Sequence, residues 1–337
     1  MKYIVVLGDG MADEPIESLG GKTPLEYANT PAMDELASRS EIGMAHTIPE
    51  GMKPGSDTAN LAVLGYNPRK YYTGRSPLEA LSIGVPLTDT DIAIRCNLVT
   101  VSDDFLSYED KTIIDHSASE ISTDDAAVLL EAVKKELQTD VFKYYVGTSY
   151  RHLLIWDRGE VVELTPPHDI LGQHINEYLP QQAALKEMMH KSYNILNNHP
   201  LNVERAKKGL NKANSIWFWG AGTRPSLTSF TEKTGLNGAM ISAVDLLKGI
   251  AVGASMKVIE VEGADGTLHT NYHGKAMAAV KTLLEDGSDF VYVHVEAPDE
   301  MGHQGSIPNK IEAIESLDHK VISVIKSKMD ESGVDYR

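Results

Sequence analysis

Cysteine is almost absent from this chain. Cys96 is the only one among 337 residues, so neither an intramolecular disulfide nor a cysteine metal cluster can form. A chain of this length buries enough apolar surface to fold without disulfides. We therefore interpret Cys96 as a small buried residue beside a strand.

Long apolar runs are missing as well. The first run, Ile4 to Leu7, is interrupted by Asp9 and is too short for a signal peptide or a membrane span. It is typical of a first β-strand. We expect a cytoplasmic protein that has no membrane partner.

Basic residues are scarce compared with acidic ones. The chain has 31 Lys and Arg against 48 Asp and Glu, which gives a formal net charge of −17. Such a field repels nucleic acid and anionic membranes, so we expect no nucleic-acid partner. It also repels phosphorylated small molecules, so a phosphate-binding site here needs local arginines or metal ions.

Strand and helix patterns alternate at both ends of the chain and indicate an α/β fold. The middle differs, because it shows short apolar stretches typical of antiparallel strands, at 144–146, 152–156 and 161–164. Long helices are expected over 180–196 and 308–328. The pattern predicts a core domain with a mostly parallel sheet, formed by residues 1–90 and 226–337. It also predicts an inserted α+β lid domain over residues 91–225.

Metal-type ligands follow two of the expected strands. Asp9 comes directly after the first strand, and Asp299 and His303 follow the strand at 290–296. Open α/β sheets place their sites at this edge, and a spacing of four puts Asp299 and His303 on one side of a helix. The alternatives are a turn former at Asp9 and a surface helix with an acidic first turn. His294 and Glu296, within the strand, are expected to be structural.

Ser56 follows Pro54-Gly55 and opens an expected helix. It fits two roles. A serine there is a common helix N-cap. It is also a candidate nucleophile, with a phosphate held by the backbone N–H groups of the helix N-terminus. A serine needs a base or a metal to become a strong nucleophile.

Basic side chains gather on expected loops of the inserted segment. Arginine binds phosphate and carboxylate through paired hydrogen bonds, although each arginine alone is more often a surface ion-pair residue. Gly220-Ala221-Gly222 is not a dinucleotide fingerprint, because it lacks the third glycine. The candidate anion-binding residues are Arg95, Arg151, His152, His168, Asp169 and Arg224, with Arg75 as a further candidate.

Three motifs together closely resemble the cofactor-independent phosphoglycerate mutases of archaeal type, in the alkaline phosphatase superfamily. They are Leu7 to Asp13, Pro54 to Asn60 and His294 to His303. Further similar stretches are residues 74–80, 95–100, 217–220 and 241–246. The resemblance covers essentially the whole chain.

The resemblance implies an alkaline-phosphatase-like core with two divalent metal ions and no 2,3-bisphosphoglycerate. Manganese is the expected metal, with zinc, cobalt or magnesium as alternatives. Asp9 and Ser56 would hold one ion, and Asp299 and His303 the other. Ser56 would become phosphoserine while 3-phosphoglycerate and 2-phosphoglycerate interconvert in glycolysis and gluconeogenesis. The anion-binding residues named above would bind this small-molecule substrate.

One departure from the family pattern concerns the end of the chain. Family members continue past the last long helix with a strand bearing an Asp-His pair and a further histidine, whereas this sequence stops at Arg337. We therefore expect a truncated chain with about half of each metal's ligands and negligible activity. The alternatives are a metal-dependent phosphatase, another phosphotransferase of the same superfamily, or an inactive fragment.

Overall fold

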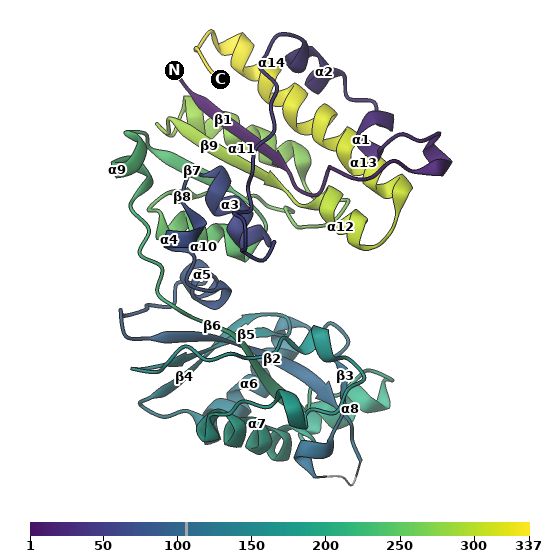
Figure 1. Cartoon of the computed structure of the whole chain (residues 1–337), viewed down its shortest axis with the longest axis vertical. Helices are drawn as coiled ribbons and strands as arrows, with labels where there is room; N and C mark the ends of the chain where they lie inside the picture. The colour runs from purple at the N-terminus through teal and green to yellow at the C-terminus, as the bar shows by residue number, and fades with distance from the viewer. Residues whose placement is uncertain (105–106) are drawn as a thin grey trace. The chain divides into compact units, whose positions relative to one another are not determined.

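The chain forms two compact units. The computed structural model describes residues 1–104 and 107–337, and these divide into a core unit, Met1–Tyr71 with Ser226–Arg337, and an inserted unit, Tyr72–Pro225 (Figure 1). The sequence pattern placed the first boundary near residue 90. Residues 72–90 belong to the inserted unit because helix α5 (Arg75–Ser82) packs against two strands of that unit's sheet.

The core unit is built on a parallel sheet of four strands. They are ordered β1 (Tyr3–Gly8), β9 (Phe290–Val295), β7 (Gly238–Ile241) and β8 (Lys257–Val258). The two central strands, β9 and β7, are apolar and almost completely buried, as expected for strands covered on both faces. Because all four run in one direction, their carboxyl ends meet at the same edge.

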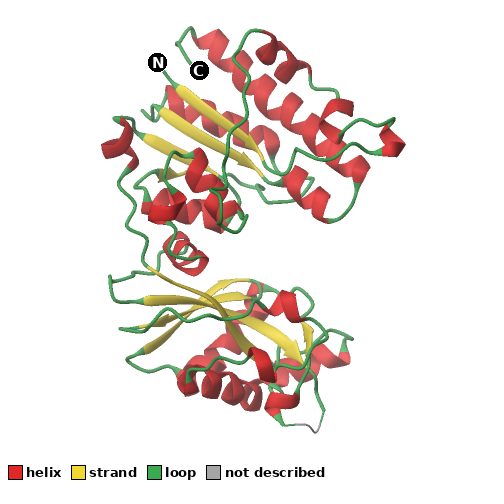
Figure 2. Cartoon of the chain, viewed as in Figure 1, coloured by secondary structure: helices red, strands yellow, loops and turns green. Residues whose placement is uncertain are grey.

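Helices cover this sheet (Figure 2). Helix α11 packs against β9 and β7, and its buried residues include Ala276, Ala279 and Leu283. The expected long C-terminal helix is present as two helices joined by one π-helical turn. The helices of the core unit are α1 (Pro24–Tyr27), α2 (Pro31–Ser38), α3 (Ser56–Val63), α4 (Pro68–Tyr71), α9 (Phe230–Thr234), α10 (Asp245–Gly253), α11 (Tyr272–Leu284), α12 (Ala297–His303), α13 (Ile307–Leu317) and α14 (Ser323–Ser332).

The inserted unit has an antiparallel sheet centred on β2 (Ile92–Val101). Strands β5 (Arg151–Trp156) and β6 (Ser215–Thr223) flank β2, β4 (Phe142–Thr148) lies beside β5, and β3 (Ile113–Asp115) pairs with the end of β2. The expected strand at 161–164 is wrong. Val162 is buried but Val161 is exposed, and the segment pairs with no described strand.

The two faces of this second sheet are covered differently. Ile94 and Cys96 of β2 point into the main core with helices α6 (Thr123–Leu137) and α7 (Ala183–Leu196). Ala93 belongs to a separate cluster that includes Ala80 of α5. Successive strand residues point to opposite faces, so β2 contributes to both layers. Cys96 is fully buried, as expected.

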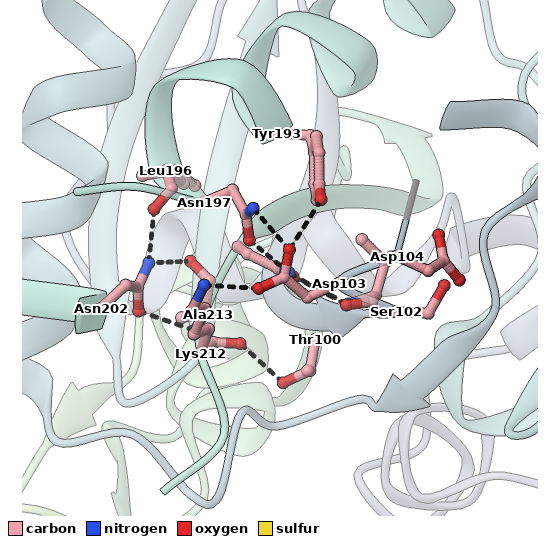
Figure 3. A network of polar contacts seen from close by, with 12 residues as sticks. Thr100, Ser102, Asp103, Asp104, Tyr193, Leu196, Asn197, Asn202, Lys212 and Ala213 are labelled. Atoms are coloured by element: carbon pink, nitrogen blue, oxygen red, sulfur yellow. Dashed lines mark hydrogen bonds and ion pairs between the residues drawn. The ribbon is translucent and has the colours of Figure 1, made fainter. Parts of the chain in front are cut away.

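A polar network ties the end of β2 to helix α7 and to helix α8 (Pro200–Lys207) (Figure 3). The carboxylate of Asp103 accepts hydrogen bonds from Asn197 Nδ2 at 2.8 Å and from Lys212 Nζ at 2.6 Å. Asn202 Nδ2 donates to the carbonyls of Leu196 and Ala213, both at 2.9 Å. The network satisfies polar groups that helix ends and loops leave unpaired, so we assign it a structural role.

Across residues 1–104 and 107–337, no helix combines the length and the apolar character that a membrane crossing requires.

Candidate active site

The carboxyl edge of the core sheet brings together polar groups from two adjacent strands. Parallel pairing of β1 with β9 places Leu7 opposite His294 and Gly8 opposite Val295. Asp9 follows β1 directly, and its backbone N–H still donates to the carbonyl of Val295 at 3.0 Å. This pairing carries the Asp9 side chain to the end of β9.

Asp9, His294 and Glu296 form a compact group whose ligand atoms lie within 4.8 Å of one another. His294 Nε2 is 3.2 Å from Asp9 Oδ2 and 3.2 Å from Glu296 Oε2. Only the contact with Asp9 has hydrogen-bond geometry, and Glu296 Oε2 is buried without a described hydrogen-bond partner. The two carboxylates of this group supply oxygen ligands that a divalent metal can use, with the imidazole hydrogen-bonded to one of them.

Asp299 and His303 lie on α12, which starts directly after Glu296. The i, i+4 spacing brings His303 Nε2 to 3.3 Å from Asp299 Oδ2, as the sequence predicts. Asp299 also touches the loop after β1. A Cβ atom built on Gly10 would lie 2.4 Å from the Cα atom of Asp299 and 2.7 Å from its Oδ1 atom. Of the four ligands expected from the sequence, Asp9 and Asp299 therefore come from adjoining segments, the loop after β1 and the first turn of α12.

Negative charge is poorly compensated at this edge. The hydrogen bond from His294 holds the pKa of Asp9 below its usual value. Burial raises the pKa of Glu296 and that of Asp299, and repulsion from Asp9 raises both further. Carboxylates held together against their mutual repulsion favour a bound cation.

Ser56 is the first residue of α3. The N-cap position belongs to Gly55, which makes no side-chain cap, so the capping role considered for Ser56 is not what the structure shows. Asn60, one turn later, donates to the Ser56 carbonyl at 2.8 Å and accepts from Tyr292 OH of β9 at 2.5 Å. These contacts attach the start of α3 to the strand that carries His294.

The inserted unit carries a cluster of cationic side chains on one face of its sheet. Glu79 Oε1 lies 3.1 Å from Arg75 Nε and 3.2 Å from Arg95 Nη2. The Arg95 guanidinium stacks on the Trp219 ring at 4.7 Å. Its Nε atom is buried without a described partner, and burial lowers the pKa of Arg95 to about 10.

Further basic groups extend this cluster. Arg151 stacks on the ring of Tyr150 at 5.1 Å, and His116 contacts that ring edge-on at 5.7 Å. His168 lies 6.1 Å from His116 between ring centroids and packs on Trp219. Burial lowers the pKa of His168, and His116 and Arg95 lower it further. Asp169, beside His168, is largely exposed with its Oδ1 atom 3.6 Å from His168 Nε2.

Two of the expected substrate-binding residues lie apart from the cluster. His152 is 1 % exposed, and its Nδ1 atom accepts from the Gly147 N–H at 3.1 Å. It pairs with Cys96 in register and therefore faces the helix-covered side. Burial lowers the pKa of His152 to about 3. Arg224 is half exposed, with its Nη1 atom 3.1 Å from Asp89 Oδ1.

Comparison with known proteins identifies the family. A family model for 2,3-bisphosphoglycerate-independent phosphoglycerate mutase matches residues 37–202. A probable mutase of this name from Geobacter sulfurreducens is 51 % identical over 99 % of this chain and 83 % of its own length. This chain belongs to that family. A Methanosarcina barkeri mutase is also 51 % identical, over 96 % of this chain and 81 % of its own length.

Solved structures agree with the assignment. The cofactor-independent phosphoglycerate mutase of Thermoplasma acidophilum is 29 % identical, with a TM-score of 0.62 over 98 % of this chain and 85 % of that one. A Pyrococcus horikoshii protein is 31 % identical, with a TM-score of 0.78 over 98 % of this chain and 78 % of that one. The expected α/β fold, with its alkaline-phosphatase-like core, is confirmed, as is the expected enzyme class, a phosphoglycerate mutase.

Sequence reasoning missed His294 and Glu296 as members of the acidic group, because it assigned both to structural roles. A signal was available, since both residues stand at the carboxyl end of an expected strand, the edge where open α/β sheets place their sites. Local pattern could not show that Asp9 lies beside them, because its position depends on pairing between residues almost 300 apart. His116 was likewise missed, and only the tertiary structure brings it beside His168.

Proposed function

We propose that the protein interconverts 3-phosphoglycerate and 2-phosphoglycerate by phosphoryl transfer through Ser56, in glycolysis and gluconeogenesis and therefore in the cytoplasm. The observation that carries this proposal is the group of Asp9, His294, Glu296 and Asp299 at the edge of the core sheet in a member of the mutase family. Such a group suits a metal-assisted phosphoryl-transfer centre.

We propose that this edge holds two divalent cations. Asp9 and Ser56 are proposed to hold one, and Asp299 and His303 the other. The fit rests on the buried Glu296 oxygen without a hydrogen-bond partner and on the raised pKa values of Glu296 and Asp299. Manganese suits mixed carboxylate and imidazole ligands, with zinc, cobalt or magnesium as alternatives. When bound, the cations would supply charge that favours the serine alkoxide and neutralises phosphate.

Ser56 is proposed as the nucleophile because of its place in the fold. Ser56 is the first residue of α3, and the N–H groups of a helix N-terminus favour a phosphate. The Thr58 N–H of this turn donates to Asp57 Oδ1 at 2.7 Å, so a phosphate would use the N–H groups before it. The hydrogen bonds of Asn60 to the Ser56 carbonyl and to Tyr292 hold this turn against β9. The backbone of Ser56 is therefore held in a defined position relative to β9.

The cationic cluster of the inserted unit is proposed to bind the substrate's phosphate and carboxylate. Arg95 has a buried guanidinium nitrogen without a partner among the described residues, which an anion can satisfy. The same face of the inserted unit carries further basic residues near Arg95, namely Arg75, Arg151, His116 and His168. His152 is assigned a structural role, since it lies on the opposite face, and Arg224 and Asp169 remain weaker candidates because both are exposed.

The experiment follows 2-phosphoglycerate formation by a coupled enolase assay, without 2,3-bisphosphoglycerate and with added Mn²⁺. Release of inorganic phosphate is measured in parallel. Isomerisation without phosphate release supports the mutase. Stoichiometric phosphate release without 2-phosphoglycerate would make the protein a phosphatase, and neither product would reject both activities for this chain.

A further inference from the structure

We propose that Ser242 and His294 are positioning residues that orient the carboxylate of Asp9 for metal binding. The proposal rests on the metal site in the proposed function and assigns roles to two residues outside the four expected ligands. It concerns a line of hydrogen bonds from Ser242 through His294 to Asp9.

The line crosses three adjacent parallel strands at their carboxyl ends. Ser242 directly follows β7, where Ile241 pairs with Val293 of β9. His294 is the next residue of β9 and lies opposite Leu7 of β1. Ser242 Oγ is 3.3 Å from His294 Nδ1, and His294 Nε2 is 3.2 Å from Asp9 Oδ2. Each side chain therefore bridges to its neighbour in the sheet.

Hydrogen-bond chemistry gives the line a direction. An ionised carboxylate only accepts hydrogen bonds, so His294 Nε2 must carry the proton that it shares with Asp9. In the neutral ring, Nδ1 is then an acceptor and the hydroxyl of Ser242 donates to it. The Val244 N–H donates to Ser242 Oγ at 3.0 Å, which occupies one lone pair and leaves the hydroxyl proton for His294.

Because Ser242 and His294 are buried, breaking the hydrogen bonds between them and Asp9 costs free energy. His294 is fully buried and Ser242 is 4 % exposed, so water has little access to replace either hydrogen bond. The buried Lys275 donates from Nζ to the His294 carbonyl at 3.1 Å and fixes the backbone as well. A buried group that loses its partner is left unsatisfied, and that loss is expensive.

His294 also selects between two carboxylates. Asp9 and Glu296 both approach Nε2 at 3.2 Å, yet only Asp9 has hydrogen-bond geometry. Glu296 Oε2 remains without a donor among the described residues. The imidazole thus holds the Asp9 carboxylate by a hydrogen bond, whereas its contact with Glu296 Oε2 is electrostatic only. Groups that hydrogen-bond metal ligands typically change metal affinity by about 10–100-fold when removed.

The test measures Mn²⁺ affinity of the full chain by electron paramagnetic resonance at constant neutral pH. We expect Ser242→Ala to bind about 10-fold more weakly and His294→Leu about 10–100-fold more weakly. His294→Gln keeps a donor for Asp9 and should recover part of the loss. The control is Ser288→Ala, because Ser288 is equally buried just before β9 and its hydroxyl has no described partner.

Folding of every variant is checked by its thermal unfolding. A folded His294→Leu or Ser242→Ala protein with the affinity of the unchanged chain would overturn the proposal. Loss of affinity in Ser288→Ala of similar size would also overturn it, because the effect would then not be specific to this line.

A second measurement needs no metal. Long-range ¹H–¹⁵N NMR of the histidine rings reports which nitrogen carries the proton. We expect His294 to be protonated at Nε2 in the metal-free chain. Ser242→Ala should keep this form, because Asp9 still accepts the proton, and should shift the Nδ1 resonance, because the hydrogen bond from Ser242 is lost. If the chain binds no Mn²⁺, the proposed metal site fails. Protonation of His294 at Nδ1 alone would overturn the line of hydrogen bonds.

Discussion

At the scale of single residues, the loop after β1 leaves no room for a side chain at Gly10. The residue has a φ of +64°, and a Cβ atom would collide with the backbone of Asp299. We expect Gly10→Ala to destabilise the protein by about 1–3 kcal/mol and to weaken Mn²⁺ binding, because Asp299 must move. Urea unfolding and metal titration measure the two effects.

The matched control for this change is Gly20→Ala. Gly20 has a φ of +70°, but no described atom lies within 4 Å of the place that a Cβ atom would take there. Gly20→Ala therefore has the same cost of a positive φ angle as Gly10→Ala, but the new methyl group collides with nothing. The metal affinity of the Gly20→Ala protein should stay unchanged. Equal effects of both variants on metal binding would contradict the argument.

Asp299 should make stability depend on pH in an unusual direction. Its pKa in the folded state lies above the ordinary value of 3.8, so its ionisation opposes folding. This penalty is absent below pH 3.8, grows as pH rises toward the folded-state pKa, and is complete above it. In EDTA, Asp299→Asn should therefore be more stable than the unchanged protein at pH 7.5, with the gain shrinking toward pH 4.

Asp289 offers a control of opposite sign. Its pKa is lowered by the hydrogen bond from the Asn237 N–H and by Lys2, so its ionisation stabilises the fold above the ordinary pKa. Asp289→Asn should be less stable at pH 7.5 and should lose this difference as pH falls. Urea midpoints at the two pH values decide both cases. A loss of stability at pH 7.5 in Asp299→Asn would refute the repulsion described at the sheet edge.

Removal of the Ser56 hydroxyl separates catalysis from folding. Ser56 makes no cap in α3, so we expect Ser56→Ala to change stability by no more than about 0.5 kcal/mol. If the unchanged chain has measurable mutase activity, that activity should fall at least about 1,000-fold, as for other lost nucleophiles, and phosphoserine labelling should disappear. Ser38→Ala, on the exposed end of α2, is the control. Retained activity in Ser56→Ala would exclude the covalent route.

At the scale of elements, strand alternation separates neighbours of different roles. Arg151 and His152 are consecutive in β5, so they point to opposite faces. Arg151→Ala should raise KM for 3-phosphoglycerate about 10–100-fold, from the loss of charged hydrogen bonds worth about 1.5–3 kcal/mol. Its thermal stability should change little.

His152→Ala should show the reverse behaviour. It removes a buried ring and the acceptor for the Gly147 N–H, so we expect a loss of about 2–4 kcal/mol in unfolding free energy. KM should stay near that of the unchanged protein. Together the two variants test whether the cationic face, and not the whole segment, binds substrate. A raised KM with unchanged stability in His152→Ala would return it to the substrate site.

At the scale of the whole molecule, the chain leaves the core unit near residue 71 and returns to it near residue 226. Within each unit, the outgoing and the returning segments are joined to each other by hydrogen bonds. In the core unit, Tyr71 OH and Thr228 Oγ1 are 3.1 Å apart. In the inserted unit, Thr73 Oγ1 donates to the Thr223 carbonyl at 2.6 Å. We therefore expect residues 72–225 to fold alone. The core unit should also fold when a short Gly-Ser linker replaces them, and circular dichroism and thermal unfolding measure both.

A shorter piece, residues 91–225, is the comparison for this prediction. It lacks Ala80, Val85 and Leu87, which are buried against Ala93 and Ile155. Removing these partners exposes an apolar face of the sheet, so the shorter piece should be less stable and more prone to aggregate. Equal stability of the two pieces would instead favour the boundary near residue 90.

Sequence alone determined the features that depend on short-range pattern. Alternating strands and helices predicted the α/β core, and the change of rhythm predicted the antiparallel insert. The spacing of Asp299 and His303 predicted their contact, because four residues make about one helical turn. The motifs around Asp9, Ser56 and Asp299 were enough to indicate the family that the comparisons then confirmed.

The tertiary structure decided what depends on contacts between distant residues. Pairing of β1 with β9 brings Asp9 to His294 across 285 positions, and α5 joins the inserted unit through contacts with strands beyond residue 91. The face of each strand residue also needed the register, which separated Arg151 from His152. The local sequence pattern determines whether a segment forms a helix or a strand. Long-range packing determines which residues lie beside that segment, and therefore which side chains can act together in a site.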